Sequence, residues 1–509
     1  MRGIRSCAAL ALLAAAPLHA AWQQATTPHF IIYADEAPAA LTARAAELEA
    51  ADATLRRLHD TGEGDGIEGN RLTIFVTRNL ASLKRIFGDP NSTTAGFYLP
   101  RASGSVAFTP LTGDGDGSKF ALKPKTVLMH EYGHHFLLGN YAVAYPAWFS
   151  EGYAEFVGTI RFDPDQIVVG QSANHRAFGL FADNGLSLAA MFDPPARLDD
   201  VQTESIYARG WALTHYLMLD PKRAGQLTTY LAAFNGGMPP LDAARKAFGD
   251  LKALDKELDA YVLRRRLPAR GIPRDRLPVA PVTIRPLSAG EAAMIETRML
   301  STRGVGEKTA PRVFDAGTKV ATLYPDDPVV QGWYAEMALD AGRDDVAEQA
   351  ADRALKLDPT QTQALLYKAR IRMQRAAKGK ATPADWKDAR SYIIRANKQS
   401  NDNAQALAMF YDSYVAEGKQ PTKNAVEALV RAQQLVPQAP ELRARLVGEY
   451  IRENRIREAR AILLPLAYDP HAGSDSQERR LLDAIDAKAD HVALERLMAG
   501  EASSAASKP

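Results

Sequence analysis

Short runs of β-branched and aromatic residues near the start of the chain alternate with alanine-rich segments whose apolar positions recur at helical spacing. The short runs predict strands and the longer segments predict helices. We expect strands at 29–33 and 71–76, helices at 39–59 and 81–87, and a hairpin from 96–98 and 105–108. Residues 21–123 are therefore predicted to form a mixed α/β part.

The pattern becomes helical after residue 123. Pro124 can occupy a first helical turn, and the apolar spacing of 126–138 continues until Gly139 and Asn140. Pro146 opens a second helix that runs to residue 156. Further helices are predicted at 205–219, 224–234 and 251–265. Residues 21–265 together are of the α+β class.

Five prolines make 266–286 a candidate linker, and a repeat follows it. Helix-ending phrases recur there, and their last residues are 34, 42, 36 and 33 positions apart. A period of 34 residues is that of tetratricopeptide repeats. The spacing of Gly342, Ala347, Ala354 and Pro359 fits that motif, and the interval of 42 indicates an insertion around 378–385. We expect an α-helical tetratricopeptide-like solenoid over 287–500. An unrelated helical domain is the alternative.

The two ends of the chain have compositions of their own. Residues 1–20 combine a short basic start with an apolar run of about ten residues and a small-residue cleavage point, which predicts a signal peptide and export to the periplasm or beyond. A short membrane anchor is the alternative, although the run is too short to span about 30 Å of hydrocarbon. Residues 501–509 are small and polar, and predict a disordered tail.

Overall composition narrows the choice of partners. Hydrophobic residues make up 46% of the 509 residues and charged residues 24%, as in globular proteins. No later run reaches 18 apolar residues, so no integral membrane segment is expected in the mature chain. The formal charge of +2 falls to zero without Arg2 and Arg5, and no basic block favours nucleic acid. Cys7, the single cysteine, lies in the signal, so no disulfide is expected.

Residues 130–134 read His-Glu-Tyr-Gly-His, the H-E-x-x-H pattern of zinc peptidases. Residues four apart on a helix lie on one face, so the imidazoles of His130 and His134 can meet one ion. Glu131 projects beside that ion, where it can take a proton from a metal-activated water. A surface helix with stray histidines is the alternative, but the apolar residues on both sides of the motif favour a buried helix that needs a metal partner.

A catalytic zinc site needs a third protein ligand, and the helix expected after Pro146 carries carboxylates. Its run Trp-Phe-Ser-Glu-Gly at 148–152 resembles the gluzincin metallopeptidases, whose third ligand is a glutamate in such a phrase. The resemblance covers about 25–265 and implies that 124–265 is a helical zincin subdomain. It also implies that Glu151 is a ligand of one Zn²⁺ per chain. Glu155, one turn later, is then placed to orient a ligand histidine; the alternative is a solvent-facing carboxylate.

A second resemblance concerns the residue that stabilises the oxyanion, the negatively charged oxygen that forms when water attacks the peptide carbonyl. Zinc aminopeptidases of this family have a Tyr-x-Lys/Arg-Gly phrase whose tyrosine stabilises it, and Tyr207-Ala-Arg-Gly is similar. His215 and Tyr216 are rivals for that role, and a core-packing tyrosine is a further alternative. The Gly-x-Met-Glu-Asn motif of the aminopeptidases is missing from 96–123, which favours an endopeptidase. The strand at 105–108 could pair with an extended substrate.

These features predict an exported zinc peptidase that hydrolyses a peptide or protein substrate with Glu131 as general base. The repeats would bind a protein partner or present substrate. The alternative is a repeat scaffold or binding protein whose zinc domain is vestigial.

Overall fold

The computed structural model of the chain describes residues 22–62, 67–113, 118–182, 184–195, 197–469 and 475–500. The predicted signal peptide, 1–20, and the predicted tail, 501–509, lie outside the described residues. Within the described ranges, every helix is too short or too polar to cross a membrane.

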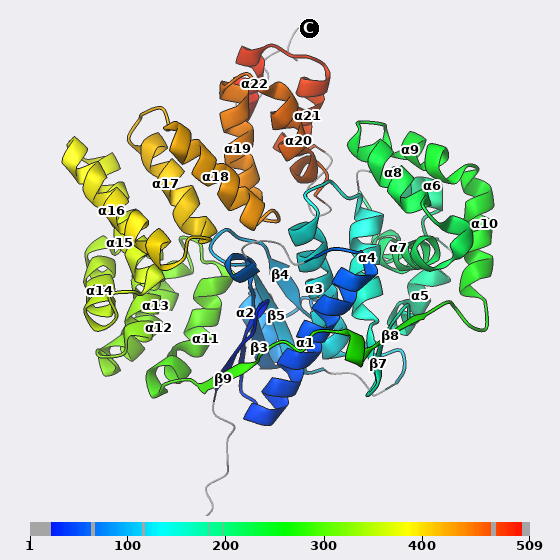
Figure 1. Cartoon of the computed structure of the whole chain (residues 1–509), viewed down its shortest axis with the longest axis horizontal. Coiled ribbons are helices and arrows are strands. Elements are labelled where there is room, and N and C mark those ends of the chain that lie inside the picture. The colour runs from blue at the N-terminus through cyan, green and yellow to red at the C-terminus, as the bar shows by residue number, and fades with distance from the viewer. Residues whose placement is uncertain are drawn as a thin grey trace, which may run out of the picture.

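A six-stranded mixed sheet lies at the centre of the molecule, in the order β4-β5-β3-β2-β1-β9 (Figure 1). Strands β2, β3 and β5 are parallel, and the other neighbours pair antiparallel. The strands are β1 (Gln23–Thr26), β2 (Phe30–Ala34), β3 (Leu72–Asn79), β4 (Phe97–Leu99), β5 (Val106–Thr112) and β9 (Thr283–Pro286). The predicted hairpin is therefore present as β4 and β5.

Helices cover both faces of this sheet. Ile74 and Val76 of β3 belong to a core with α1 (Pro38–Leu58) and α3 (Pro124–Asn140). Phe75, between them, points the other way and packs with α2 (Leu80–Phe87) and α11 (Ala289–Arg303). This alternation is the two-residue period of a strand that is buried on both faces.

The strand over 106–108 has partners on both sides, β3 and β4, because it lies inside the sheet. It therefore cannot accept a further strand, and our expectation that it pairs with substrate was wrong. The edge strand on this side of the sheet is β4. Sequence patterns show which segments form strands but not their order in the sheet.

A mainly helical region follows β5. At its centre, α4 packs against α3 on one side and against α7 on another. The region also contains a small sheet in the order β6-β7-β8 and several short helices. The bounds are α4 (Ala147–Gly158), α5 (Ala177–Leu180), α6 (Leu188–Phe192), α7 (Asp200–Leu219), α8 (Gln226–Asn235), α9 (Pro240–Phe248), α10 (Leu251–Val262), β6 (Arg161–Phe162), β7 (Gln166–Val169) and β8 (Arg270–Pro273).

The proline-rich segment 266–286 is not a free linker. Its first half forms β8, which completes the small sheet, and its second half forms β9, which pairs with β1 at the edge of the large sheet. Proline lacks an N–H and so favours edge strands, which is where both strands lie. The connection is therefore part of both sheets.

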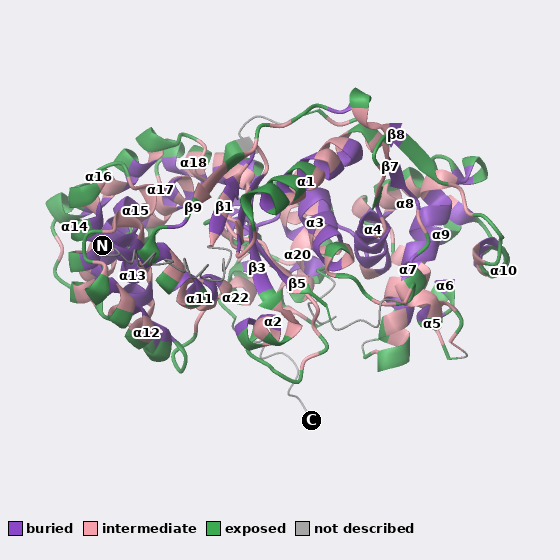
Figure 2. Cartoon of the chain, turned by 90° about the horizontal axis from the view of Figure 1, so that it is seen from below, coloured by how far each residue is buried: buried purple, intermediate pink, exposed green. Residues whose placement is uncertain are grey.

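Residues 289–498 form an array of antiparallel helices, α11 to α22, that curves around the sheet (Figure 1). Figure 2 shows that buried residues follow the inner faces of these helices. Gly342 and Gly418 have φ values of 69° and 71° at the turns after α13 and α17, where a residue with a side chain would be strained. The bounds are α12 (Ala310–Leu323), α13 (Pro328–Asp340), α14 (Asp344–Leu357), α15 (Thr362–Lys378), α16 (Pro383–Gln399), α17 (Ala404–Ala416), α18 (Lys423–Leu435), α19 (Pro440–Arg452), α20 (Ile456–Ala467), α21 (Gln477–Asp486) and α22 (His491–Met498).

The insertion expected near 378–385 lengthens two helices instead of forming a separate loop. Helices α15 and α16 have 17 residues each, whereas α13 and α14 have 13 and 14. Each long helix gains about one turn, which conserves the stacking of the array.

Candidate metal centre

Helix α3 supplies the two histidines and the glutamate of the motif, and its packing fixes their direction. Leu128, Met129 and Phe136 bury the opposite face of the helix in the core. Gly133, inside the motif, faces α4 so closely that a Cβ would come within 2.9 Å of the Ala154 Cα. The glycine therefore lets the two helices approach, and the histidines face the second helix.

Helix α4 begins directly after Pro146 and is buried from Trp148 to Gly158. Gly152 and Gly210 let it cross α7 at close range, since a Cβ on Gly152 would lie 2.3 Å from the Gly210 carbonyl oxygen. One face of α4 carries Glu151 and Glu155, which are one turn apart and both almost fully buried. The crossing thus presses both carboxylates towards α3.

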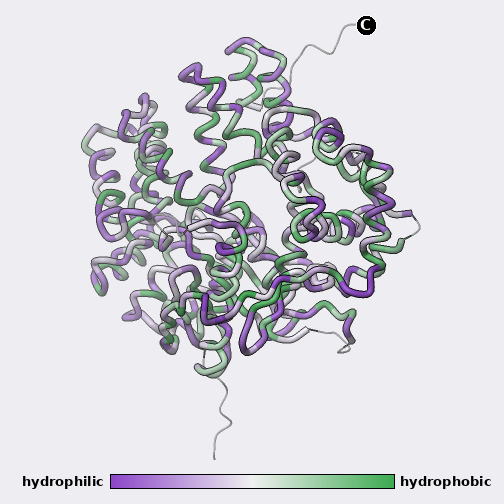
Figure 3. The backbone as a smooth tube through the Cα atoms, turned by 45° about the vertical axis from the view of Figure 1, so that its right-hand side comes forward, coloured by the Kyte–Doolittle hydropathy of each residue, from purple (hydrophilic) through white to green (hydrophobic). Residues whose placement is uncertain are grey.

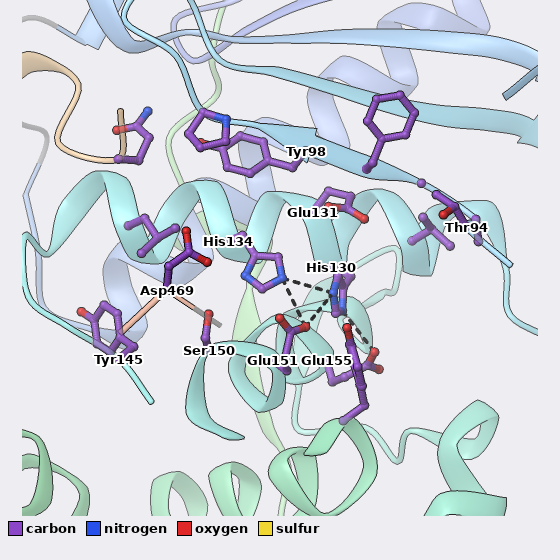
Figure 4. Close-up of a pocket in the computed structure, with 18 of the residues that line it drawn as sticks. Thr94, Tyr98, His130, Glu131, His134, Tyr145, Ser150, Glu151, Glu155 and Asp469 are labelled. Carbon is purple, nitrogen blue, oxygen red and sulfur yellow. Dashed lines mark hydrogen bonds and ion pairs between the residues drawn. The ribbon is translucent and has the colours of Figure 1, made fainter. Parts of the chain in front are cut away.

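Three donor atoms converge between the two helices (Figure 4). The Nε2 atoms of His130 and His134 are 3.3 Å apart, and each lies 3.5 Å from Oε2 of Glu151. Tetrahedral bonds of about 2.0–2.1 Å would separate the ligand atoms by about 3.3–3.4 Å. Two imidazoles and one carboxylate are also a donor set that Zn²⁺ prefers. The residues present therefore fit a tetrahedral ion and leave its fourth position to the cavity.

Glu155 supports this triangle from behind. Its Oε1 lies 3.1 Å from Nδ1 of His130, the nitrogen that faces away from the other donors. His175 lies 2.7 Å from the other carboxylate oxygen, and Arg176 donates to Oε1 from Nε and Nη2 at 3.0 and 2.7 Å. Glu155 is thus a buried carboxylate with three partners and not the solvent-facing side chain of the alternative.

Charge balance shapes the titration of these groups. Burial disfavours the charged form of His130, but the carboxylates of Glu151 and Glu155 outweigh it and raise its pKa to about 10. Burial likewise opposes ionisation of Glu155, and His130, His175 and Arg176 overcome it and lower its pKa well below the ordinary value. The pKa of Glu151 is lowered in the same way by the two histidines. The carboxylates of Glu151 and Glu155 are therefore ionised inside the protein, and they stabilise positive charge on the groups beside them.

A cavity of about 1040 Å³ lies over the three donors, and Glu131 lines it beside them. Edge strand β4 and the segment before it, 93–96, form the opposite wall. Gly96 makes this approach possible, because a Cβ there would come within 2.3 Å of Val127 in α3. The cavity therefore combines the triangle, a carboxylate and an exposed strand edge.

The structure separates the three candidates for an oxyanion donor. Tyr207 lines the cavity, its ring is stacked on that of His130 at 6.2 Å, and burial raises the pKa of its hydroxyl. His215 is fully buried elsewhere, between the Tyr261 hydroxyl and the Gly170 carbonyl. Tyr216 donates to Glu257 outside the cavity. Of the three, Tyr207 alone faces the donor triangle.

Two groups of functional neighbours were missed at the sequence level. His175 and Arg176 come from a short helical turn some 20 residues after Glu155, and no local motif marks them. Arg176 also binds Glu204 and lies 4.6 Å above the Tyr207 ring, so it joins the carboxylate network to the tyrosine. The second group consists of array residues that line the cavity. They lie some 300 positions after the motif at 130–134, and no spacing in the sequence predicts that they share a cavity with it.

Comparison with known proteins adds little to this geometry. No family model matches the chain, and no curated protein matches it. Among solved structures, the chain is similar to a thermophilic TPR protein from Thermus thermophilus, with 17% identity and a TM-score of 0.33 over 39% of this chain and 100% of that one. The helical hairpins described above belong to this chain's own structure and do not depend on that likeness.

Proposed function

We propose that the protein is a zinc-dependent peptidase of the gluzincin type. The triangle of His130, His134 and Glu151, with separations of 3.3 to 3.5 Å, carries the proposal. Glu131 and Tyr207 line the same cavity as the triangle, which supports an enzyme over a structural metal site. A metal held only for stability would be enclosed by four protein ligands.

Zinc, when bound, supplies a Lewis acid that acidifies water and polarises a carbonyl. Glu131 then accepts the proton of the attacking water and returns it to the leaving amine. The Tyr207 hydroxyl, which stays protonated because its pKa is raised, donates a hydrogen bond where negative charge develops on the carbonyl oxygen. Glu155 holds His130 in the orientation that its Nε2 needs.

The substrate class follows from the wall opposite the triangle. Strand β4 is an edge strand, and its residues line the cavity. An extended peptide can add to such an edge through main-chain hydrogen bonds. This would lay its scissile bond over the donor atoms. We also propose that residues 1–20 direct export and that the array, of tetratricopeptide type, contacts a protein partner.

The test replaces Glu131 by Gln, because the amide keeps the shape and cannot accept a proton. We expect Glu131→Gln to keep one zinc per chain, measured by elemental analysis, and to lose cleavage of a broad peptide library, measured by mass spectrometry. Wild-type cleavage should also disappear on chelation and return with zinc. Full activity in the variant would remove Glu131 from the role of base. A zinc-loaded wild-type protein that cuts nothing would instead favour the helical array as a binding scaffold.

A further inference from the structure

One end of the cavity is built by the helical array and not by the part of the chain that holds the donor triangle. The connection between α18 and α19 and the end of α20 approach the region around α3 (Figures 1 and 3). Gln438 binds Asn70 and also donates to the Ser105 hydroxyl at 3.2 Å. The Tyr468 ring meets Phe234 of α8 edge-on at 4.5 Å. This wall is therefore fixed in place.

Arg443 of α19 lies in this wall with only 4% of its surface exposed, yet it lines the cavity. Its Nε donates to the Pro437 carbonyl at 2.8 Å, and Nη1 reaches the Ile462 carbonyl at 3.5 Å. Among the described residues, no carboxylate lies within ion-pair distance of its guanidinium. Burial lowers the pKa of Arg443 to about 10, so the group is still charged at neutral pH.

The contrast with Arg176 is informative, because Arg176 is the other guanidinium among the described residues that line the cavity. It is neutralised by Glu155 and Glu204. A buried charge that lacks a counter-charge is costly, and buried charges are normally paired. The guanidinium at the cavity wall thus lacks a counter-charge among the described residues, and an anion that enters the cavity can supply one.

A second donor lines the same cavity as Arg443. It is Tyr145, and burial raises the pKa of its hydroxyl, which therefore stays protonated. Figure 4 places Tyr145 on the same side of His134 as Asp469. Asp469 lines this end too. Guanidinium and phenol together form a donor pair that suits a carboxylate.

We propose that Arg443, assisted by Tyr145, binds a carboxylate of the peptide substrate. The proposal rests on the peptidase function and makes the array part of the substrate site. The carboxylate is either the C-terminus of a short peptide or an Asp or Glu side chain. A C-terminal carboxylate is the simpler occupant, because array residues form this end of the cavity and a peptide that ends there need not continue past them.

Three probes separate these sources: acetyl-pentaalanine with a free C-terminus, the same peptide as its amide, and acetyl-Ala-Ala-Glu-Ala-Ala amide. Their affinities are measured by calorimetry on the zinc-supplemented Glu131→Gln protein, so that no cleavage intervenes. We expect the free acid to bind on the order of 10- to 100-fold more tightly than the neutral amide, as for hydrogen bonds to charged groups. Preference for the glutamate peptide over the free acid would assign the site to acidic side chains.

Arg443→Gln in the same background should abolish this preference, and Arg445→Gln is the matched control. Arg445 lies two residues away on α19 and pairs with Asp412 outside the cavity. Because Arg443 also holds two carbonyls, thermal melts check its fold, and Tyr145→Phe offers a gentler variant that should weaken only the acid peptide. Equal affinities for the three probes, or a preference that survives in Arg443→Gln, would overturn the proposal. Arg443-dependent binding with no cleavage by wild type would refute the peptidase function alone.

Discussion

At the scale of single residues, Glu155 connects the proposed metal centre to the rest of the site. It contacts His130, His175 and Arg176 while 2% exposed. Its negative charge neutralises the guanidinium of Arg176, and its contact with Nδ1 fixes the orientation of the His130 ring. Such outer contacts tune metal affinity because they set ligand orientation and basicity.

Replacing Glu155 by Gln should therefore weaken zinc binding about 10- to 100-fold, as is usual when an outer partner is removed. The measurement is competition with a chromophoric chelator. Glu204→Gln is the control, because Glu204 binds Arg176 but is not in contact with His130. An unchanged zinc affinity in Glu155→Gln would mean that packing alone orients the imidazole.

A different prediction concerns Tyr207, because it lines the cavity but is not one of the three proposed metal ligands. Tyr207→Phe keeps the ring that stacks on His130 and loses only the hydroxyl. Removing one oxyanion donor lowers kcat about 100- to 1000-fold. We expect that loss with little change in KM and full zinc content. A loss confined to KM would assign the hydroxyl to substrate binding instead.

At the scale of elements, the crossing of α4 and α7 decides where Glu151, the proposed carboxylate ligand, lies. Gly152 follows Glu151 directly, and the backbone of α7 passes against it at Gly210. A side chain at Gly210 would come within 2.5 Å of the Trp148 carbonyl oxygen. The glycine after the ligand is thus required by helix packing and not by the chemistry of the metal.

Gly152→Ala should force the two helices apart. Overpacking of this kind costs about 1–3 kcal/mol, and here it would also displace Glu151. The free energy of unfolding and the zinc affinity should both fall, as measured by denaturant titration and chelator competition. Gly306→Ala is the control, since a Cβ there has no neighbour within 4 Å and its φ is not positive. Wild-type zinc affinity in Gly152→Ala would show that the helices can separate without moving the ligand.

At the scale of the whole molecule, the array and the donor region share one hydrophobic core. Buried residues from α17 to α22 belong to the same cluster as those of α1, α3, α4 and α7. Near the other end of the array, Arg303 of α11 donates to the Phe87 carbonyl at 2.7 Å. Glu441 of α19 accepts from the Ala102 N–H at 2.7 Å. The array is thus attached at several points rather than at one linker.

Thermal unfolding should therefore be a single calorimetric transition. Zinc at 100 times its dissociation constant would stabilise the fold by about 2.7 kcal/mol, and so raise the midpoint of a chain this long by about 3 °C. Chelation should lower the whole transition by a similar amount. Two transitions, of which zinc moves only one, would show that the shared core does not couple the parts.

Local patterns predicted much of this architecture for physical reasons. The strands at 29–33 and 71–76 and the helices at 39–59 and 126–138 are present within a few residues, because each buries a face of regular period. The short strand β1 was missed because Gln-Gln-Ala-Thr has no apolar run, and its stability comes from pairing with β2 and β9. The short helix α6 was missed for a similar reason, since packing and not length maintains it.

The sequence by itself determined that His130, Glu131 and His134 lie on one helix, because their spacing of one turn is a local property of the backbone. It also determined the order of helices in the array. Only the tertiary structure decided that Glu151 comes within 3.5 Å of both imidazoles, that His175 and Arg176 reach Glu155, and that Arg443 lines the same cavity. These contacts join residues tens to hundreds of positions apart, and their distances follow from how helices pack, which spacing along a chain does not encode.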